Sequence, residues 1–186
     1  MEKLEEDIEQ EEEAKEEATQ VRELALFAGV GGGILASKLA GHRIMAAVEI
    51  DSYCRNVLMV RQEEGHLDPF PIFSDIHSFQ GAYFNGHIDV ITAGFPCTPF
   101  SVAGKREGEV DEKNLWPETR RVIGEVQPGR VFLENVPGLL RMYGDTVLGD
   151  LSALGFDCRW GVVSARDSGA RHLRNRWWCL ANSESR

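Results

Sequence analysis

From residue 23 onward, short apolar runs of the kind found in buried strands alternate with stretches of helical character. Alternation of this kind pairs the strands in parallel, because each helix carries the chain back to the edge where the previous strand began. We therefore predict an α/β fold around a doubly wound, mostly parallel sheet of about seven strands. Gly41 should close the first helix and Ser52 should cap the second. The expected strands are residues 23–27, 42–48, a short run before 75, 88–93, 131–133, 156–163 and 176–180, and the expected helices are 32–39, 52–61, 115–126 and 145–154.

The negative charge of the chain is concentrated in its first twenty residues. They hold ten Asp or Glu and two Lys, a charge of −8, whereas the remaining 166 residues carry 20 acidic and 18 basic groups, a charge of −2. Because this tail has few apolar side chains to bury, we predict a solvated helix or a disordered segment over residues 1–20, ahead of one domain over residues 21–186. A coiled-coil arm or a DNA-mimicking segment is the less favoured interpretation.

Composition narrows the class of protein. A chain with 42% hydrophobic and 27% charged residues is typical of a globular domain, and it has no apolar run long enough to cross a membrane. No apolar stretch like that of a secretory signal occurs in residues 1–20, so we expect a cytoplasmic protein. The cysteines at 54, 97, 158 and 179 have neither CxxC spacing nor a histidine cluster, which argues against a metal site and against a disulfide framework.

A glycine-rich turn, Gly29-Val30-Gly31-Gly32-Gly33, joins the first expected strand to the first expected helix. Glu49 lies twenty residues after Gly29, at the end of the second expected strand, where a carboxylate can bind ribose hydroxyls. The pairing fits a nucleoside cofactor of either kind, NAD or S-adenosylmethionine. A tight turn beside a surface glutamate is the structural alternative.

One cysteine follows an apolar strand, in the stretch Ile91-Thr92-Ala93-Gly94-Phe95-Pro96-Cys97-Thr98-Pro99. Gly94 allows the backbone to turn, and the prolines fix φ on either side of Cys97. We expect the thiol on a stiff loop beyond the carboxyl edge of the sheet, where open α/β folds bind ligands and where a thiol can act as a nucleophile. A small buried apolar residue is the alternative for a lone cysteine.

Two further stretches place polar side chains in comparable positions. The apolar strand within residues 130–138 ends in Glu134 and Asn135, which we expect at the same sheet edge as Cys97. Near the C-terminal end, Arg174 and Arg176 are spaced by two, so on a strand they face the same side. A salt-bridged strand edge is the alternative for these two arginines.

The stretches FAGVGGG, GFPCTPFS and ENVPG, in this order and at these spacings, resemble motifs of the C5-cytosine DNA methyltransferase family. The resemblance extends over residues 23–180. It implies a Rossmann-like, S-adenosylmethionine-dependent methyltransferase fold and DNA as the substrate. It also implies catalytic roles for Cys97, Glu134, Arg174 and Arg176, with Arg176 favoured as the contact to a flipped base near O2.

The same resemblance implies which residues hold S-adenosylmethionine. Phe27, Gly29 and Gly31 would line the methionine side, and Glu49 would bind the ribose. Ile50 would cover the adenine and Asp75 would accept a hydrogen bond from its amino group, although an ordinary turn aspartate is the alternative. The full set implied is Phe27, Gly29, Gly31, Gly32, Glu49, Ile50, Asp75, Ile76 and Leu115.

These residue types suit methylation of cytosine at C5. C5 is a poor nucleophile, and a thiolate that adds to C6 supplies the electrons that C5 lacks. Negative charge then rises at N3, where a carboxylic acid such as Glu134 can stabilise it. C5 takes the methyl group, a base removes the C5 proton, and Cys97 is eliminated. In a duplex the cytosine must first be flipped out, at a cost of about a few kcal/mol.

The sequence also departs from the family pattern. Thr98 and His172 each replace a glutamine, and residues 111–115 match their motif only loosely. Typical members continue past the position of Leu180 with a target-recognition region and a final segment that packs beside the first helix. We therefore expect the catalytic part of a truncated or split enzyme, with Ile34 and Leu35 exposed, that needs a second polypeptide or its continuation for full activity.

Three other functions are compatible with parts of the sequence. Methylation of cytosine in tRNA would use the same chemistry on another substrate. A non-catalytic subunit would bind the cofactor and a partner only, although the presence of both Cys97 and Glu134 argues against it. An NAD-dependent oxidoreductase would account for Gly29 and Glu49 but not for the other two motifs.

Overall fold

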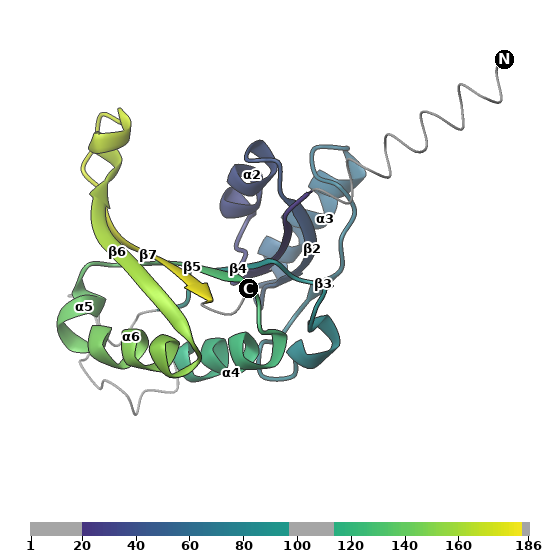
Figure 1. Ribbon diagram of the computed structural model, residues 1–186. Helices are drawn as coiled ribbons and strands as arrows, with labels where there is room; N and C mark the ends of the chain where they lie inside the picture. The colour runs from purple at the N-terminus through teal and green to yellow at the C-terminus, as the bar shows by residue number, and fades with distance from the viewer. Residues whose placement is uncertain (1–19, 97–113, 184–186) are drawn as a thin grey trace, which may run out of the picture.

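The computed structural model describes residues 20–96 and 114–183, and a seven-stranded sheet forms the centre of this fold (Figure 1). The strands lie across the sheet in the order β3-β2-β1-β4-β5-β7-β6. Strands β1 to β5 pair with one another in parallel, and β7 is antiparallel to both β5 and β6. The predicted mostly parallel α/β sheet is therefore confirmed. The strands are β1 (Arg22–Leu26), β2 (Arg43–Val48), β3 (Ile72–Phe73), β4 (Val90–Ala93), β5 (Arg130–Asn135), β6 (Phe156–Ser164) and β7 (Asn175–Ser183).

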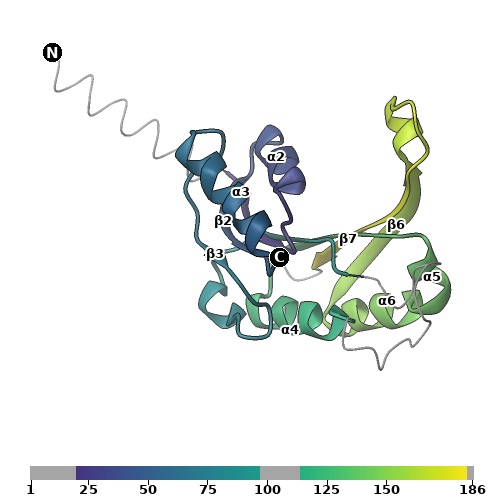
Figure 2. The same ribbon diagram turned by 180° about the vertical axis from the view of Figure 1, so that it is seen from behind.

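Helices pack on both faces of the sheet (Figures 1 and 2). One face, called here the α2 face, carries α2 (Gly32–Leu39) and α3 (Ser52–Glu63). The opposite face, called the α4 face, carries α4 (Trp116–Val126), α5 (Gly138–Met142) and α6 (Gly144–Ala153). The short 3-10 helices η1 (Gly81–Phe84) and η4 (Ala165–Ser168) complete the described elements. No helix within residues 20–96 and 114–183 is both long enough and apolar enough to span a membrane.

The larger core lies on the α4 face. Leu24, Ile91 and Leu133 point to this face from three neighbouring strands and are fully buried. They pack in one cluster with Ile123 of α4 and Leu151 of α6. Each large apolar side chain buried in this way stabilises the fold by roughly 1.5–3 kcal/mol, so this face supplies most of the hydrophobic stabilisation.

A smaller core lies on the α2 face, over β1 and β2. Ala25 and Ala47 of these strands pack with Ile34 of α2 and Leu58 of α3. Ile34 is only 2% exposed, so the prediction that it would be exposed is wrong, because α2 docks on β1 through this residue. Leu35, the next residue, is 44% exposed, as predicted.

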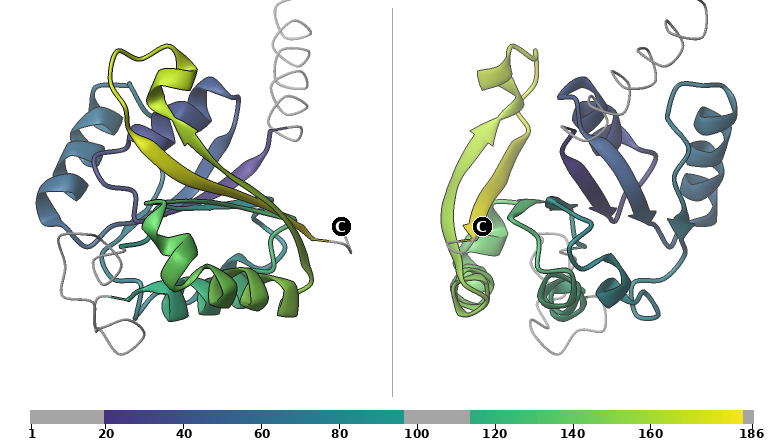
Figure 3. Two further views of the ribbon diagram at one scale, coloured as in Figure 1. Left: turned by 90° about the vertical axis from the view of Figure 1, so that its left-hand side faces the viewer. Right: turned by 45° about the vertical axis from the view of Figure 1, so that its right-hand side comes forward.

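Strands β6 and β7 form a long hairpin that projects past the rest of the molecule, with η4 at its tip (Figure 3). The tip is fastened by its own hydrogen bonds. The Ser164 hydroxyl accepts from the Arg166 N–H, and the Asp167 carboxylate accepts from the Ser164 N–H at 2.8 Å. Gly169 ends η4 with φ of 90°, a backbone conformation that favours glycine.

Local sequence signals place most elements within a few residues of their bounds, with three differences. The second helix begins at Ser52, but its cap is Asp51, whose carboxylate accepts from the Cys54 N–H at 2.9 Å. The expected strand 176–180 is the longer β7, because it pairs with β5 and β6 together. The short helices α5, η1 and η4 have too few residues to give a periodic signal and were not predicted. Residues 1–19 and 97–113, with the predictions for the acidic tail, Cys97 and Thr98, lie outside the described residues.

Candidate active site

A cavity of about 810 Å³ opens on the α2 face, between α2 and the hairpin. Ile34 and Ser37 of α2 form one wall, and Val163 and Ser164 of the hairpin form the other. The floor is made by the central strands β1, β4 and β5 near their carboxyl ends, the usual ligand edge of an open α/β sheet. Of the predicted site residues that the structure describes, four line this cavity: Phe27, Glu134, Arg174 and Arg176.

Glu134 and Arg176 meet at the wall of the cavity. They come from the neighbouring strands β5 and β7, and Arg176 Nε lies 2.6 Å from Glu134 Oε1. Glu134 Oε2 lies 3.4 Å from the point that a Cβ on Gly94 would occupy. The carboxylate therefore lies beside the start of the loop that leads to Cys97, and a Cβ at position 94 would be in van der Waals contact with it.

Asn135 ties this loop to the end of β5. Its side chain is buried, its Nδ2 donates to the Phe95 carbonyl at 3.0 Å, and its Oδ1 accepts from the Val136 N–H. Phe95 is buried as well and packs on Trp116 of α4, with ring centroids 5.3 Å apart. The chain thus enters the Cys97 segment from an anchored position.

The glycine-rich turn adopts backbone angles that favour glycine. Gly29 and Gly31 have φ of 54° and 87°, and a Cβ on Gly31 would lie 2.7 Å from Leu58 Cδ2. Phe27 also has positive φ, at 56°, which is uncommon for a residue with a bulky side chain. Gly31 is the N-cap of α2, and Gly32 is the first residue of that helix.

Glu49 holds the turn together from the end of β2. It is 8% exposed, its Oε2 accepts from the Gly29 N–H at 2.6 Å, and its Oε1 accepts from the Asp51 N–H at 2.8 Å. Ile50, the next residue, is 69% exposed. The carboxylate therefore fixes two backbone segments, and the neighbouring apolar side chain stays open to solvent.

The remaining predicted cofactor residues follow β3 and precede α4, outside the lining of the cavity. Asp75 accepts from the His77 N–H at 2.9 Å and contacts His77 Nδ1 at 2.8 Å. These hydrogen bonds, the backbone one first, lower the pKa of the Asp75 carboxyl. Ile76 is buried in the core of the α4 face, and Leu115 is the partly buried N-cap of α4.

Arg121 is a residue whose position the sequence did not indicate. From α4, its guanidinium donates to the carbonyls of Ile76 at 2.6 Å and of Phe79 at 3.0 Å, and it pairs with Glu118 and Glu125. Glu125 in turn accepts from the Gly81 N–H. An arginine three or four residues from two glutamates has the pattern of ordinary helix-surface ion pairs, so its contact with the 75–81 loop carries no local signal.

A second buried polar cluster supports α2. Glu23 is fully buried on β1, and its carboxylate accepts from Ser37 of α2 at 2.9 Å and from Thr92 of β4 at 2.7 Å. His42 Nδ1 contacts the same carboxylate at 2.7 Å. Because Ser37 and Thr92 line the cavity, this cluster fixes one wall of the site to its floor.

Comparison with known proteins places this geometry in context. The profile of the family described as C-5 cytosine-specific DNA methylase matches residues 21–186. The Type II methyltransferase M.CviJI of Paramecium bursaria Chlorella virus IL3A is 38% identical over 86% of this chain and 42% of its own length. The Type II methyltransferase M.NgoMIV of Neisseria gonorrhoeae is 35% identical over 84% of this chain and 50% of its own length. The chain thus spans about half the length of these relatives.

Solved structures agree on the fold. A prophage-encoded E. coli protein, described as a DNA modification methyltransferase, aligns with a TM-score of 0.73 and 27% identity, over 89% of this chain and 47% of its own. The Dnmt2 methyltransferase of S. pombe aligns with a TM-score of 0.71 and 23% identity, over 90% of this chain and 52% of its own. The second likeness is one of fold alone.

Proposed function

The chain belongs to the C-5 cytosine-specific DNA methylase family, and we propose that residues 21–186 form a cofactor-binding catalytic domain. The proposed reaction transfers a methyl group from S-adenosylmethionine to C5 of a cytosine in DNA. The position of Glu134 carries the proposal. Its carboxylate lines the cavity, contacts Arg176 and lies beside Gly94, three residues before Cys97.

In this proposal the chain's own residues act on the base. The Cys97 thiolate adds to C6, which forms a C–S bond and makes C5 nucleophilic. Glu134 donates a hydrogen bond or a proton to N3, where the negative charge develops, and Arg176 contacts the base near O2. After methylation, loss of the C5 proton lets the C–S bond break and releases the thiolate.

The glycine turn and its neighbours fit S-adenosylmethionine, which supplies an electrophilic methyl group when bound. No atom of residues 20–96 and 114–183 that could clash lies within 4 Å of the point where a Cβ would stand on Gly29 or Gly32, so a ligand can approach the backbone there. Ile50 is exposed and free to cover a flat ring. Each carboxylate oxygen of Glu49 accepts one backbone hydrogen bond and keeps a lone pair for a ribose hydroxyl.

Trapping with 5-fluorocytosine tests the covalent step. Fluorine cannot leave C5 as a cation, so an oligonucleotide that carries this base should stay attached to the protein through Cys97 in the presence of S-adenosylmethionine. In an assembly that contains the partner or continuation, a denaturant-stable adduct is expected for the natural chain and no adduct for Cys97→Ala. An adduct that persists in Cys97→Ala would reject Cys97 as the nucleophile.

The other cysteines serve as matched controls. Burial raises the pKa of the Cys179 thiol to about 12, and burial also raises the pKa of the Cys158 thiol. Both thiols are therefore poor nucleophiles near neutral pH. Cys158→Ala and Cys54→Ala should still form the adduct, because neither side chain lines the cavity.

We also propose that this domain needs a second polypeptide, or a continuation of its own chain, for full activity. The support is the part of the α2 face that lies over β5 and β7 (Figure 1). Phe132 and Leu180 are 37% and 39% exposed there, and Phe132 stacks on Trp178 with ring centroids 5.3 Å apart. No helix within the described ranges covers these side chains. Clustered exposed apolar groups of this kind mark an interaction surface.

Turnover of the 186-residue chain alone tests this need. We expect negligible transfer of tritiated methyl groups to duplex DNA, and a gain when a candidate partner is added. Robust turnover by the isolated chain would contradict the need for a partner and leave the reaction intact. Transfer to tRNA instead of DNA would keep the chemistry and replace the substrate.

A further inference from the structure

Positive charge gathers at the tip of the β6–β7 hairpin. Residues 164–176 contain four arginines and one aspartate, a charge of +3. Residues 21–186 as a whole carry −2, so the rest of this domain carries −5. The hairpin is therefore a local exception in an otherwise acidic domain.

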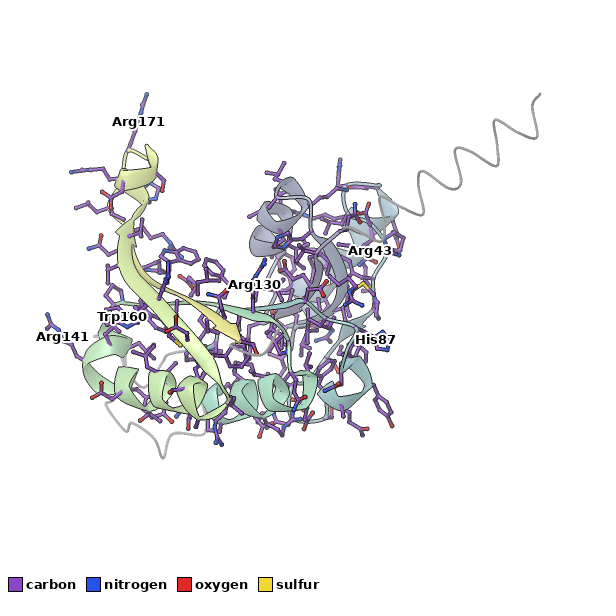
Figure 4. The ribbon with its side chains drawn as sticks, viewed as in Figure 1. Arg43, His87, Arg130, Arg141, Trp160 and Arg171 are labelled. Carbon is purple, nitrogen blue, oxygen red and sulfur yellow. The ribbon has the colours of Figure 1, made fainter. Side chains whose placement is uncertain are left out.

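Three of these arginines are available to a partner. Arg166, Arg171 and Arg174 are exposed, and none of them forms an ion pair with a carboxylate of residues 20–96 or 114–183. Figure 4 shows Arg171 at the outer end of the hairpin, directed away from the rest of the molecule. Arg176 differs, because it is half-buried and pairs with Glu134.

The backbone that carries these arginines is ordered by local hydrogen bonds. The Ala165 N–H donates to the Arg174 carbonyl at 3.2 Å, and the Ala170 N–H donates to the Ala165 carbonyl at 3.0 Å. Asp167 is the only acid of the tip, and its carboxylate bonds the Ser164 N–H. A partner would thus meet a pre-formed set of guanidinium groups and would pay little entropy to order the loop.

We propose that Arg166 and Arg171 bind the phosphate backbone of DNA, and that Arg174 extends this contact to the cavity. The proposal rests on the proposed function, which makes DNA the substrate. Guanidinium groups bind phosphate oxygens in pairs, and such contacts set the position of a duplex without reading its sequence. Since Ser164, Ala165 and Arg174 line the cavity, a backbone held at the tip lies next to the site of the target base.

Salt dependence of DNA binding tests the proposal with the full 186-residue chain. The test variant is Arg166→Gln/Arg171→Gln, and the control is Arg141→Gln, which removes one charge from an exposed arginine of α5. Figure 4 shows Arg141 on the opposite side of the sheet from the tip, also directed outward. Binding to a labelled duplex of arbitrary sequence is followed by fluorescence anisotropy over a series of low salt concentrations.

The double variant should flatten the slope of log Kd against log salt by about 2, or about 1 for each phosphate that is no longer neutralised. The weakening should be the same for every duplex sequence, and Arg141→Gln should leave the slope unchanged. The proposal would be overturned if the double variant had the same slope of log Kd against log salt as the natural chain. It would also be overturned if Arg141→Gln changed this slope as much as the double variant does. Preference of the natural chain for polyglutamate over DNA would also overturn it, in favour of an acidic protein partner.

The proposed reaction is tested separately, by the Cys97 adduct that the chain forms with its partner present on single-stranded DNA that contains 5-fluorocytosine. An adduct in the natural chain, together with an unchanged salt slope in the double variant, would reject the role of the tip and keep the reaction. A flattened slope in the double variant, together with no adduct from the natural chain in the assembly that contains the partner, would reject the reaction and keep the DNA-binding tip.

Discussion

The two faces of the sheet differ in what covers them. On the α4 face, three helices close over the central strands, and side chains such as Leu133 and Trp177 are fully buried. On the α2 face, two helices cover β1 and β2, and the strands beyond them present Phe132, Glu134 and Trp178 to a cavity. Successive side chains of a strand point to opposite faces. Along β5, one set of alternate side chains is therefore buried on the α4 face, and the other set points to the α2 face, where the cavity lies. We therefore expect that, of two adjacent residues on β5, substitution of the one on the α4 face lowers the stability of the fold, whereas substitution of the one on the α2 face lowers activity.

The largest effect should come from the covered face. Leu133→Ala removes a fully buried side chain from the α4 face and should lower the free energy of unfolding by about 3 kcal/mol. Phe132→Ala, one residue away, removes a side chain that is 37% exposed and should cost about 1 kcal/mol or less. Urea denaturation followed by circular dichroism measures both. Equal losses would show that the α2 face over β5 is covered after all.

Glu134→Gln should spare stability and damage the reaction. The carboxylate is 32% exposed, and in the proposed reaction it stabilises charge that develops on the base only after thiolate addition. We expect kcat to fall by about 10², with little change in the affinity for S-adenosylmethionine. Single-turnover kinetics in the competent assembly and isothermal titration of the cofactor measure the two quantities. If the variant bound S-adenosylmethionine weakly and kept its kcat, Glu134 would be assigned to cofactor binding and not to the reaction.

Arg121 connects the covered face to the site edge and should give an intermediate effect. Arg121→Met removes the donors to the carbonyls of Ile76 and Phe79, so the 75–81 loop that we propose holds the adenine should loosen. We expect about tenfold weaker binding of S-adenosylmethionine, equivalent to about 1.4 kcal/mol, with kcat at saturation nearly unchanged. Arg121→Lys should recover only part of the loss, because lysine lacks the planar fork.

The neighbouring arginine gives the matched control for this prediction. Arg120 lies on the same helix, is 48% exposed and pairs with Asp150, away from the loop. Arg120→Gln should leave the cofactor affinity unchanged. If both variants weaken the cofactor equally, the effect belongs to α4 as a whole and the specific clamp is rejected.

The smallest effect should come from the amino-terminal edge of the strands, opposite the site. Arg22 and Asp89 form an ion pair at 2.8 Å with side chains that are 37% and 43% exposed. The hydrogen bond from Arg22 lowers the pKa of Asp89, so the folded state binds this proton less readily than the unfolded state. The resulting stability is present above the ordinary Asp pKa of about 3.9 and is lost as pH falls through the lower folded value.

For so exposed a pair this contribution should stay under about 1 kcal/mol. Asp89→Asn should remove it, so that the difference in unfolding free energy between the natural chain and the variant narrows below about pH 4. Urea titrations at a series of pH values measure that difference. A difference that stays constant through the acid range would show that the Asp89 hydrogen bonds, rather than its charge, stabilise the edge.

Predictions from sequence succeeded where one residue type or one local period decides the structure. Alternating strand and helix patterns identified the sheet, and glycine identified the turn at Gly29 and Gly31, where φ is positive. Prediction was weaker where partners are distant in sequence. The Arg121 contacts cross about 40 residues, and the Glu23 cluster joins β1, α2 and β4. Nothing local marks these residues, because their partners come together only in the folded chain.

The chain order of apolar and polar residues by itself determined the strand and helix pattern, the glycine turn and the stretches that hold Cys97 and Glu134. Only the tertiary structure decided that Arg176 pairs with Glu134 and that Asn135 holds Phe95. It also decided that Ile34 is buried whereas the face over Phe132 is open. The physical reason is that period and backbone preference act over a few residues, whereas side-chain contact and burial depend on which strands the sheet places side by side.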